Sequence, residues 1–389
     1  MQRPVFPLMS ADGRKAPRVD VFKAARASKK GEDAAAICLP VLAEEKLAGV
    51  AAFAIFDGHS GKEAGIRCAE MVCQRLIAKG PPFEPAAIAD MLWAVDEEVG
   101  RTAVRDGATA QILLVEPVED RLKCTLAWCG DSSAVVTNTC DPAGTVFYAT
   151  ESHTAGPDHQ GGGRYADEKL RLEFYSAVRA AVEAEGIDTL RDETTAEMVR
   201  AAIAKVQTSM HAEADVALLV KAFRRGKIIA ETHPDGCESR KNLFVRQRDV
   251  EHDPNQVWVV ATATERSDPG YSDLQMTRSM LDWRAADMVL PEPQIHSFEV
   301  PADGLYRVCL ASDGLWDVCD FAVAARHMVD EKTIGRAARR LLRIAEDEYL
   351  TNRGHEMMDD DTTVLVVELN PSGTPYAGGS SGGACCVVA

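Results

Sequence analysis

Short apolar segments that meet aspartates at one end constrain the fold of this chain more than any other feature. Aspartate motifs follow three such segments and precede a fourth: FDGHSG at 56–61, GDS at 130–132, SDGLWD at 312–317 and DDDTT at 359–363. In antiparallel pairing, the end of one strand lies beside the start of its neighbour. The four motifs can therefore meet on one rim of a sheet.

Six segments have the composition of buried strands, with β-forming or small apolar residues bounded by Gly, Asp, Ser or Asn. They span residues 51–56, 112–115, 123–128, 257–261, 306–310 and 363–368. Helical spacing or a capping box marks other segments, at 62–76, 87–99, 194–197, 216–223 and 337–345. Because strands and helices do not alternate strictly, the pattern favours sheets flanked by helices over a doubly wound parallel sheet.

The acidic composition restricts the class of protein. The chain has 389 residues, of which 46% are hydrophobic, and a net charge of −17. Since it contains no long Lys/Arg run, we expect no nucleic-acid partner. The 11 cysteines lack CxxC spacing, which indicates reduced thiols in a cytosolic protein. The longest apolar run, 47–56, is too short to span a bilayer, and no secretory signal precedes it.

Clustered carboxylates favour a particular kind of metal site. Several carboxylates are costly to pack together unless a cation neutralises them. Oxygen-only ligands favour Mg²⁺ or Mn²⁺ over Zn²⁺. In the first motif, Gly58 lets the backbone approach a ligand closely, and His59 follows directly.

In order and context, the four motifs resemble the PPM family, the PP2C-type serine/threonine protein phosphatases. Weaker marks of the family are the acidic pair Glu32–Asp33, DGATA at 106–110 and MTRS at 276–279. The resemblance covers roughly residues 25–370, apart from one insertion. It implies an α+β fold, in which two antiparallel β-sheets lie face to face and are flanked by helices. It also implies metal-dependent hydrolysis of phosphoserine and phosphothreonine in proteins.

The resemblance assigns roles in binding two Mg²⁺ or Mn²⁺ ions. Asp57 would bridge both ions, and the Gly58 carbonyl would be a ligand of the second. Asp313 and Asp360 would bind the first ion. Glu32 would hold the second, partly through water.

Two further roles follow from the same resemblance. Asp131 is similar to the residue that, with Asp313, holds a third and weaker metal. His59 is similar to the histidine proposed as general acid for the leaving alcohol. The physical logic is that a metal-activated water attacks phosphorus in line, after which the serine or threonine alkoxide needs a proton.

The chain also departs from the family pattern. Ser28 stands where members often carry an arginine that binds substrate phosphate, and Arg26, Lys29 or Lys30 could replace it. Leu281 stands where a glycine turn is usual. These departures leave a second hypothesis open, a pseudophosphatase that acts as a regulatory binding module. A third hypothesis, an unrelated metal-dependent nuclease, fits the acidic composition poorly.

The sequence predicts three regions. Residues 1–24 form an N-terminal extension, 25–370 the phosphatase domain with a helical insertion at about 160–225, and 371–389 a flexible Gly/Ser tail. The insertion could set substrate choice or be a neutral elaboration.

The last four residues resemble a prenylation box. Cys386 would carry the prenyl group, and Cys385 could carry a palmitoyl chain. The sequence therefore predicts a cytoplasmic, monomeric enzyme that acts on phosphorylated proteins while anchored to the cytoplasmic face of a membrane.

Overall fold

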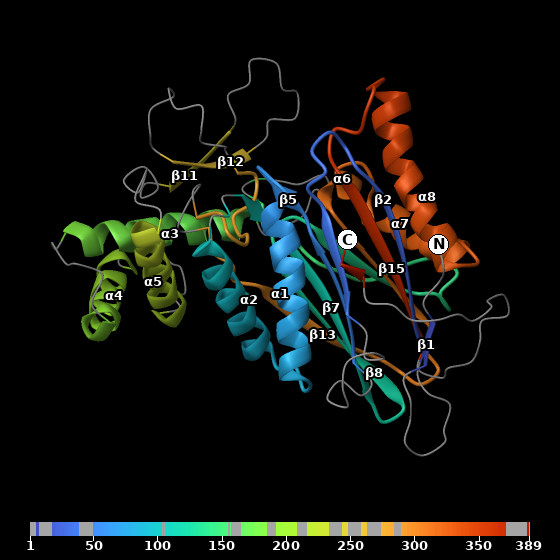
Figure 1. The fold of residues 1–389 in the computed structure, drawn as a ribbon, viewed down its shortest axis with the longest axis horizontal. Coiled ribbons are helices and arrows are strands. Elements are labelled where there is room, and N and C mark those ends of the chain that lie inside the picture. Colours follow the sequence, from blue (N-terminus) through green and yellow to red (C-terminus); the bar gives the residue numbers. More distant parts are fainter. Residues whose placement is uncertain are drawn as a thin grey trace.

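Two six-stranded antiparallel sheets lie face to face at the centre of the computed structural model (Figure 1). The structure describes residues 5–7, 18–38, 50–102, 104, 106–154, 156, 165–184, 192–207, 216–232, 243–247, 258–262, 274–283, 289–370 and 387–388. In order across the first sheet, the strands are β1 (Val5–Pro7), β2 (Arg18–Arg26), β15 (Thr362–Asn370), β14 (Tyr306–Ala311), β9 (Ser133–Asn138) and β10 (Val146–Ala149). Across the second sheet they are β13 (Gln294–Val300), β8 (Arg121–Cys129), β7 (Ala110–Val118), β4 (Ala51–Phe56), β3 (Ala34–Cys38) and β16 (Val387–Val388).

Helices cover the outer face of each sheet. The second sheet is covered by α1 (Glu63–Lys79) and α2 (Pro85–Gly100), and the first by α7 (Phe321–Asp330) and α8 (Ile334–Glu346). A π-helical segment, Asp347–Asn352, continues α8, and a short helix, α6 (Asp313–Trp316), follows β14. Two further sheets have two strands each: β5 (Gly58–His59) pairs with β6 (Gly107–Ala108), and β11 (Leu243–Gln247) pairs with β12 (Trp258–Thr262). The predicted α+β sandwich of two sheets flanked by helices is confirmed.

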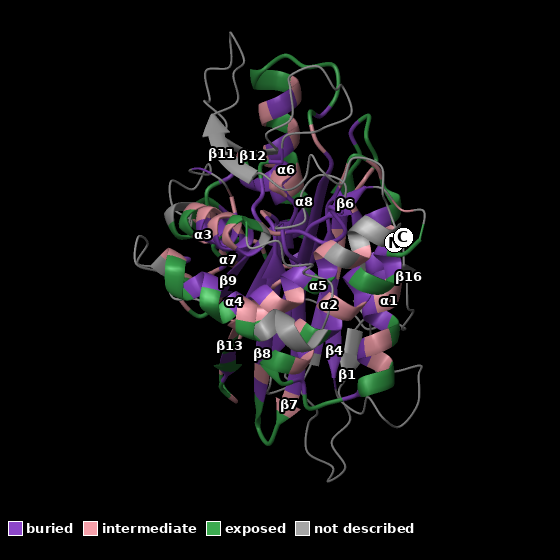
Figure 2. Cartoon of the chain, turned by 90° about the vertical axis from the view of Figure 1, so that its left-hand side faces the viewer, coloured by how far each residue is buried: buried purple, intermediate pink, exposed green. Residues whose placement is uncertain are grey.

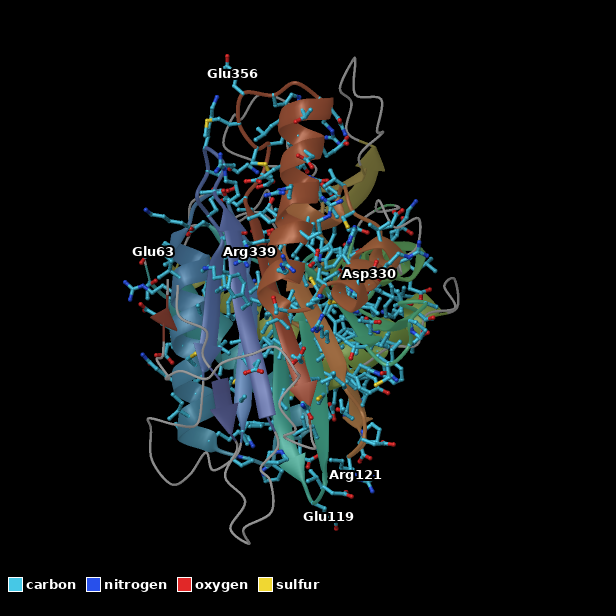
Figure 3. All side chains as sticks on the ribbon, turned by 90° about the vertical axis from the view of Figure 1, so that its right-hand side faces the viewer. Glu63, Glu119, Arg121, Asp330, Arg339 and Glu356 are labelled. Atoms are coloured by element: carbon cyan, nitrogen blue, oxygen red, sulfur yellow. The ribbon has the colours of Figure 1, made fainter. Side chains whose placement is uncertain are left out.

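The central strands are apolar on both faces because each face packs against another layer. In β4, Phe53 and Ile55 point into the core between the sheets, whereas Ala54 and Phe56 point toward α1 and α2. Figure 2 shows buried residues throughout both sheets and exposed ones on the outer helices and turns. Charged side chains such as Glu63, Arg121 and Arg339 project from this outer surface (Figure 3). The layered burial explains why these strands lack polar alternation.

The predicted elements are largely confirmed. The six predicted strands form β4, β7, β8, β12, β14 and β15, and the helical segments fall in α1, α2, α5 (Val216–Thr232) and α8. The capping box predicted at 194–197 is misplaced, because helix α4 (Asp192–Gln207) begins earlier.

Three expectations need correction. The domain does not begin at residue 25, because β2 starts at Arg18, pairs with β15 and buries Val19 and Val21 between the sheets. The tail does not lie wholly outside the fold, because its two valines in β16 pair with the edge strand β3. β-branched residues suit such an edge.

The prediction that the cysteines are reduced is wrong for Cys73, which is disulfide-bonded. The described free cysteines are Cys68, Cys124, Cys129, Cys140, Cys309 and Cys319.

The predicted insertion contains three helices: α3 (Tyr165–Ala184), α4 and α5. Their apolar faces form a separate cluster in which Phe174, Val178 and Leu219 are buried. Leu274 and Leu290, which flank the TRS segment, belong to the same cluster. The insertion is therefore packed onto the segment that leads back into the sandwich.

Candidate active site

Antiparallel pairing of β14 with β15 brings two acidic motifs together. The ladder ends with Ala311 opposite Val364. Asp313 follows this pair closely and Asp360 precedes it closely, so both carboxylates reach one rim of the first sheet. In Figure 1 this rim lies near the labels α6 and β5.

Asp57 reaches the same rim from the second sheet. It directly follows β4 and is 8% exposed. Its amide donates to Thr109 Oγ1 (3.1 Å), and its carbonyl accepts from the Thr109 amide (2.8 Å). Its carboxyl group lies within hydrogen-bond reach of both Asp33 and Asp313. Asp57 is therefore the carboxylate that joins the contributions of the two sheets.

A buried carboxylate, Asp361, fixes the loop that carries Glu32 and Asp33. Its oxygens accept hydrogen bonds from the backbone amides of Ser28, Glu32 and Asp33. Burial opposes its ionised form, but the amides of Ser28 and Glu32 outweigh this effect and lower the pKa of Asp361. The loop is thereby held against the start of β15.

The motifs surround one pocket of about 120 Å³. The predicted site residues that line it are Asp57, Gly58, His59, Asp131, Asp313 and Asp360. Glu32 is not part of this lining; its carboxylate lies beside Lys30 and accepts a hydrogen bond from the Gly61 amide. The structure thus brings the core of the predicted set together and places Glu32 at its margin.

The crowded carboxylates disfavour one another's ionised forms. Burial raises the pKa values of Asp57 and Asp313 well above the usual range, and nearby carboxylates, including Asp131 and Asp360, raise them further. Burial also raises the pKa of Asp33 to about 6, against the opposing effect of hydrogen bonds from Thr363 and other groups. The pocket therefore favours a positive charge among these residues.

The donor set fits hard divalent cations. Oδ1 of Asp33 and Oδ1 of Asp313 are buried, and neither has a hydrogen-bond partner among the described residues. The Lys30 ammonium already lies 2.7 Å from Asp360 Oδ2. Within the described part of the chain, no three His, Cys, Asp or Glu side chains form a metal cage by themselves. Mg²⁺ does not require one, since it keeps several waters and takes one or two carboxylates.

His59 is held by a carboxylate that the sequence did not single out. Its Nε2 lies 2.8 Å from both side-chain oxygens of Asp282. Burial opposes protonation of the imidazole, but the charge and hydrogen bond of Asp282 outweigh it, so the pKa of His59 is raised. Nδ1 has no hydrogen-bond partner among the described residues. His59 therefore lines the pocket with Nε2 fixed by Asp282 and with a pKa raised in favour of the protonated imidazole.

Lys30 is the basic residue that the structure places at the site. Of the three basic residues considered from the sequence, Lys30 lines the pocket, whereas Arg26 pairs with Glu346 at 3.8 Å. Burial opposes the charge of Lys30, but the hydrogen bond and charge of Asp360 outweigh it and raise the pKa of Lys30. Ser28 contributes its backbone to the loop and has no cationic function.

Sequence reasoning missed two residues that shape the site. Asp361 is 2% exposed and organises the loop that carries Glu32 and Asp33, a role that its place within an acidic run does not specify. Asp282 contacts His59 through a turn whose geometry no short motif encodes. The signal available in the sequence was that Asp282 follows Leu281, which stands where the family pattern has a glycine.

The family model for protein phosphatase 2C matches residues 18–159 and 255–352, more than half of the chain. The chain belongs to the PP2C family. The PP2C match begins with β2, and it leaves the three insertion helices unmatched. A curated PP2C relative, "Probable protein phosphatase 2C 5" of Arabidopsis thaliana, is 32% identical over 100 residues. That alignment spans 26% of this chain and 21% of the relative, about a fifth of its length.

Solved structures support the PP2C fold. A serine-threonine phosphatase 2C from Toxoplasma gondii is similar with a TM-score of 0.58 at 17% identity, covering 95% of this chain and 99% of its own. A sex-determining protein of C. elegans is similar with a TM-score of 0.52 at 14% identity, covering 90% of this chain and 65% of its own. At these identities the likeness concerns the fold alone.

The raised carboxyl pKa values predict that stabilisation by Mn²⁺ grows with pH. Asp33 titrates near 6 in the folded protein, against roughly 3.9 for an unfolded aspartate. The metal-free folded state therefore binds more protons than the unfolded state, and it loses stability as the pH rises through this window. Asp57 and Asp313 extend the loss to higher pH. Since metal competes with protons, the gain from Mn²⁺ should be small at low pH and reach about 2.7 kcal/mol at 100 times Kd once the sites ionise.

Thermal unfolding with and without Mn²⁺, at about pH 5 and about pH 7, measures this difference. Excess chelator should reverse the gain, and Asp360→Asn should reduce it. An equal or larger gain at the lower pH would contradict the assignment of these carboxylates to a metal site.

Proposed function

We propose that this protein hydrolyses phosphoserine and phosphothreonine esters in proteins with the help of Mg²⁺ or Mn²⁺. The observation that carries the proposal is the convergence of Asp57, Asp313 and Asp360 with His59 around one pocket. Membership of the PP2C family supports the same activity.

The acidic residues would hold the ions. Asp57 stands between the two sheets and suits a bridging position, Asp313 and Asp360 suit the first ion, and the Gly58 carbonyl and Glu32 suit the second. Asp131 lines the pocket near Asp313, where a third and weaker ion would sit. When bound, Mg²⁺ or Mn²⁺ supplies an activated water as nucleophile and offsets charge on the phosphoryl oxygens.

His59 supplies the proton that the leaving group needs. A serine or threonine alkoxide is a poor leaving group, and general acids accelerate such steps by about 10²–10⁴-fold. Asp282 raises the pKa of the imidazole, which favours its protonated form, and fixes the ring through Nε2. Proton donation from His59 to the alkoxide oxygen is then the step that we assign to this pair.

A pseudophosphatase remains the alternative function. Ser28 in place of an arginine and Leu281 in place of a glycine favour it. Retention of the carboxylates together with the His59–Asp282 pair favours catalysis, because a pure binding module needs neither. Turnover of a phosphothreonine peptide by the purified protein separates the two functions.

Replacement Asp313→Asn should abolish hydrolysis while the fold persists. The change removes one charge from the metal-binding set and almost no volume. Even outer partners of metal ligands cost roughly 10–100-fold in activity, so we expect a loss above that range with an unchanged far-ultraviolet spectrum. Mn²⁺-dependent turnover of a phosphothreonine peptide is the assay. Asp330→Asn on α7, which is exposed (Figure 3) and does not line the pocket, is the matched control and should retain full activity. A fully active Asp313→Asn protein would refute the proposed mechanism.

Replacement Lys30→Met should weaken substrate binding more than the chemical step. Lys30 is the pocket's cation, and an ammonium can hold a phosphate as a point charge. We expect KM for the phosphothreonine peptide to rise roughly tenfold, the scale of one charge-assisted hydrogen bond, with a smaller change in kcat. Lys29→Met, next to it in the same loop, is the control. An unchanged KM in Lys30→Met would remove Lys30 from substrate binding.

Membrane attachment, a cytoplasmic location and a monomeric state stay predictions. Cys385 and Cys386 lie outside the described residues, and no described helix is long and apolar enough to cross a bilayer. Cell fractionation tests the attachment: the wild-type protein should sediment with membranes and Cys386→Ser should not. Equal partitioning of the two proteins would exclude lipid on Cys386 as the anchor.

A further inference from the structure

We propose that the insertion positions the general acid, with Arg225 of α5 acting through Asp96 to hold the turn that places Asp282 against His59. Arg225 and Asp96 are positioning residues, since neither touches the pocket that holds the carboxylates. The catalytic consequence of this inference rests on the proposed function, and its structural part does not.

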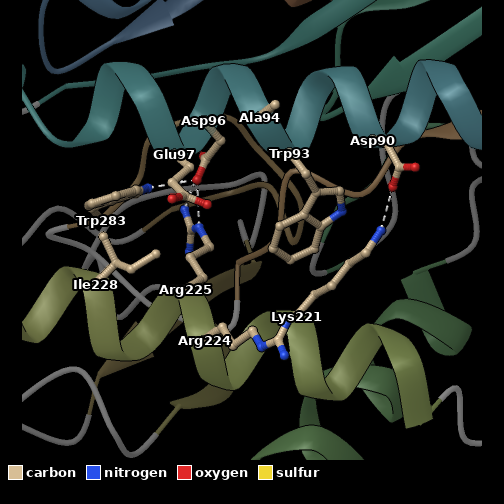
Figure 4. A pocket seen from close by; sticks show the side chains of 10 residues that line it. All are labelled: Asp90, Trp93, Ala94, Asp96, Glu97, Lys221, Arg224, Arg225, Ile228 and Trp283. Carbon is tan, nitrogen blue, oxygen red and sulfur yellow. Dashed lines mark hydrogen bonds and ion pairs between the residues drawn. The ribbon is translucent and has the colours of Figure 1, made fainter. Parts of the chain in front are cut away.

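Asp96 is the centre of the connection. It lies on α2 and is 1% exposed. One oxygen accepts from the Leu281 amide (2.7 Å), and the other from Trp283 Nε1 (2.7 Å) and Arg225 Nε (2.8 Å). Figure 4 shows Asp96, Trp283 and Arg225 meeting between α2 and α5. A single buried carboxylate thus joins a helix of the sandwich, a helix of the insertion and the turn.

The buried charge of Asp96 needs a cation. Removing one partner of a buried ion pair is strongly destabilising, because it leaves the other charge uncompensated. Arg225 is 4% exposed, approaches Asp96 with two nitrogens and lies over the Trp283 ring at 5.7 Å. The sandwich alone therefore supplies the acceptor, and the insertion supplies the charge that keeps it in place.

The turn requires this support because Leu281 has an unfavourable backbone conformation. Its φ is 67°, in the left-handed region that is unfavourable for a residue with a Cβ. Its side chain is 3% exposed in the core beneath α1 and α2, and its amide is bonded to Asp96. These two contacts hold Leu281 where a glycine would need no such help.

Asp282 follows Leu281, so the turn determines where its carboxylate lies. The Ser279 hydroxyl donates to the same carboxylate that contacts His59. Gly107 packs against the contact between Asp282 and His59, and a Cβ on it would collide with both His59 Nε2 and Asp282 Oδ1. The fit leaves little room for movement, so a shift of the turn would separate Asp282 from the imidazole.

A second contact ties the insertion to the same segment. Glu168 of α3 is 3% exposed and accepts from Thr277 Oγ1 (2.8 Å) and Arg278 Nη2 (2.6 Å). The segment 277–283 is thus held at one end by α3 and at the other through Asp96 by α5. The insertion is a support of the site, which differs from both the specificity element and the neutral elaboration considered from the sequence.

The test is Arg225→Met, which keeps the apolar stem and removes the charge. If Asp282 no longer fixes His59, kcat should fall most for substrates whose leaving group needs a proton. We expect a loss of roughly 10–100-fold on a phosphothreonine peptide and a much smaller loss on a nitrophenyl phosphate, with KM little changed. Asp282→Asn should show the same dependence on the leaving group, and the double variant should lose little more.

Lys221→Met is the matched control. Lys221 lies one turn earlier on α5, lines a second pocket between α2 and α5 together with Arg225, and pairs with Asp90 at the surface (2.8 Å; Figure 4). This variant should keep the wild-type dependence on the leaving group. Arg225→Lys retains the charge without the two-nitrogen contact, so it should be intermediate, and it serves as the test variant if Arg225→Met does not fold.

Amide hydrogen exchange gives a readout that needs no activity. Exchange in a peptide covering 278–283 should be faster in Arg225→Met than in the wild type and unchanged in Lys221→Met. A wild-type protein that hydrolyses no phosphoester would refute the proposed function, and exchange would still test the link through Asp96. A folded Arg225→Met protein with wild-type exchange and wild-type dependence on the leaving group would overturn the inference.

Discussion

Mutual repulsion among buried carboxylates is the constraint on which the rest of this structure depends. Asp57, Asp313 and Asp360 come from both sheets, and backbone pairing within each sheet forces them to one rim. Burial and neighbouring charges raise the pKa values of Asp57 and Asp313. The large apolar core of the sandwich offsets the cost of this arrangement, and a bound cation would remove the repulsion.

A different set of contacts positions the His59–Asp282 pair. His59 belongs to the first motif, whereas its partner Asp282 stands on a turn after the TRS segment. The Met280 backbone pairs with Ala108 of β6, and Asp96 of α2, which is paired with Arg225 of the insertion, accepts from the Leu281 amide. The carboxylates are therefore placed by strand ends and the His59–Asp282 pair by contacts with helices and β6, and His59 meets the carboxylates at the pocket.

Much of the fold could be predicted because the central strands are buried on both faces. β4 is a continuous apolar run, β15 contains one at 364–367, and an acidic motif stands at one end of each strand. Strands with mixed composition were missed. β13 (QIHSFEV) pairs with only one neighbour and keeps partly exposed polar residues, and β2 (RVDVFKAAR) carries several charges. Their assignment depends on the pairing partner, which a single sequence does not contain.

The same distinction applies to the site. Asp57, Asp313 and Asp360 were predictable because each stands next to an apolar strand. The pairing of Asp282 with His59 was not, since it depends on the positive φ of Leu281 and on Asp96, which is distant in the sequence. Asp361 belongs to a run of acidic residues, and the hydrogen bonds that it accepts from the backbone amides of Ser28 and Glu32 distinguish it from its neighbours.

The most direct measurement is a calorimetric titration of the metal-free protein with Mn²⁺ at neutral pH, with the bound ions counted. We expect saturable binding of two ions per chain and weaker binding of a third ion at Asp131. Absence of saturable binding by a protein that is folded at the start of the titration would contradict the proposal that these carboxylates form a metal site.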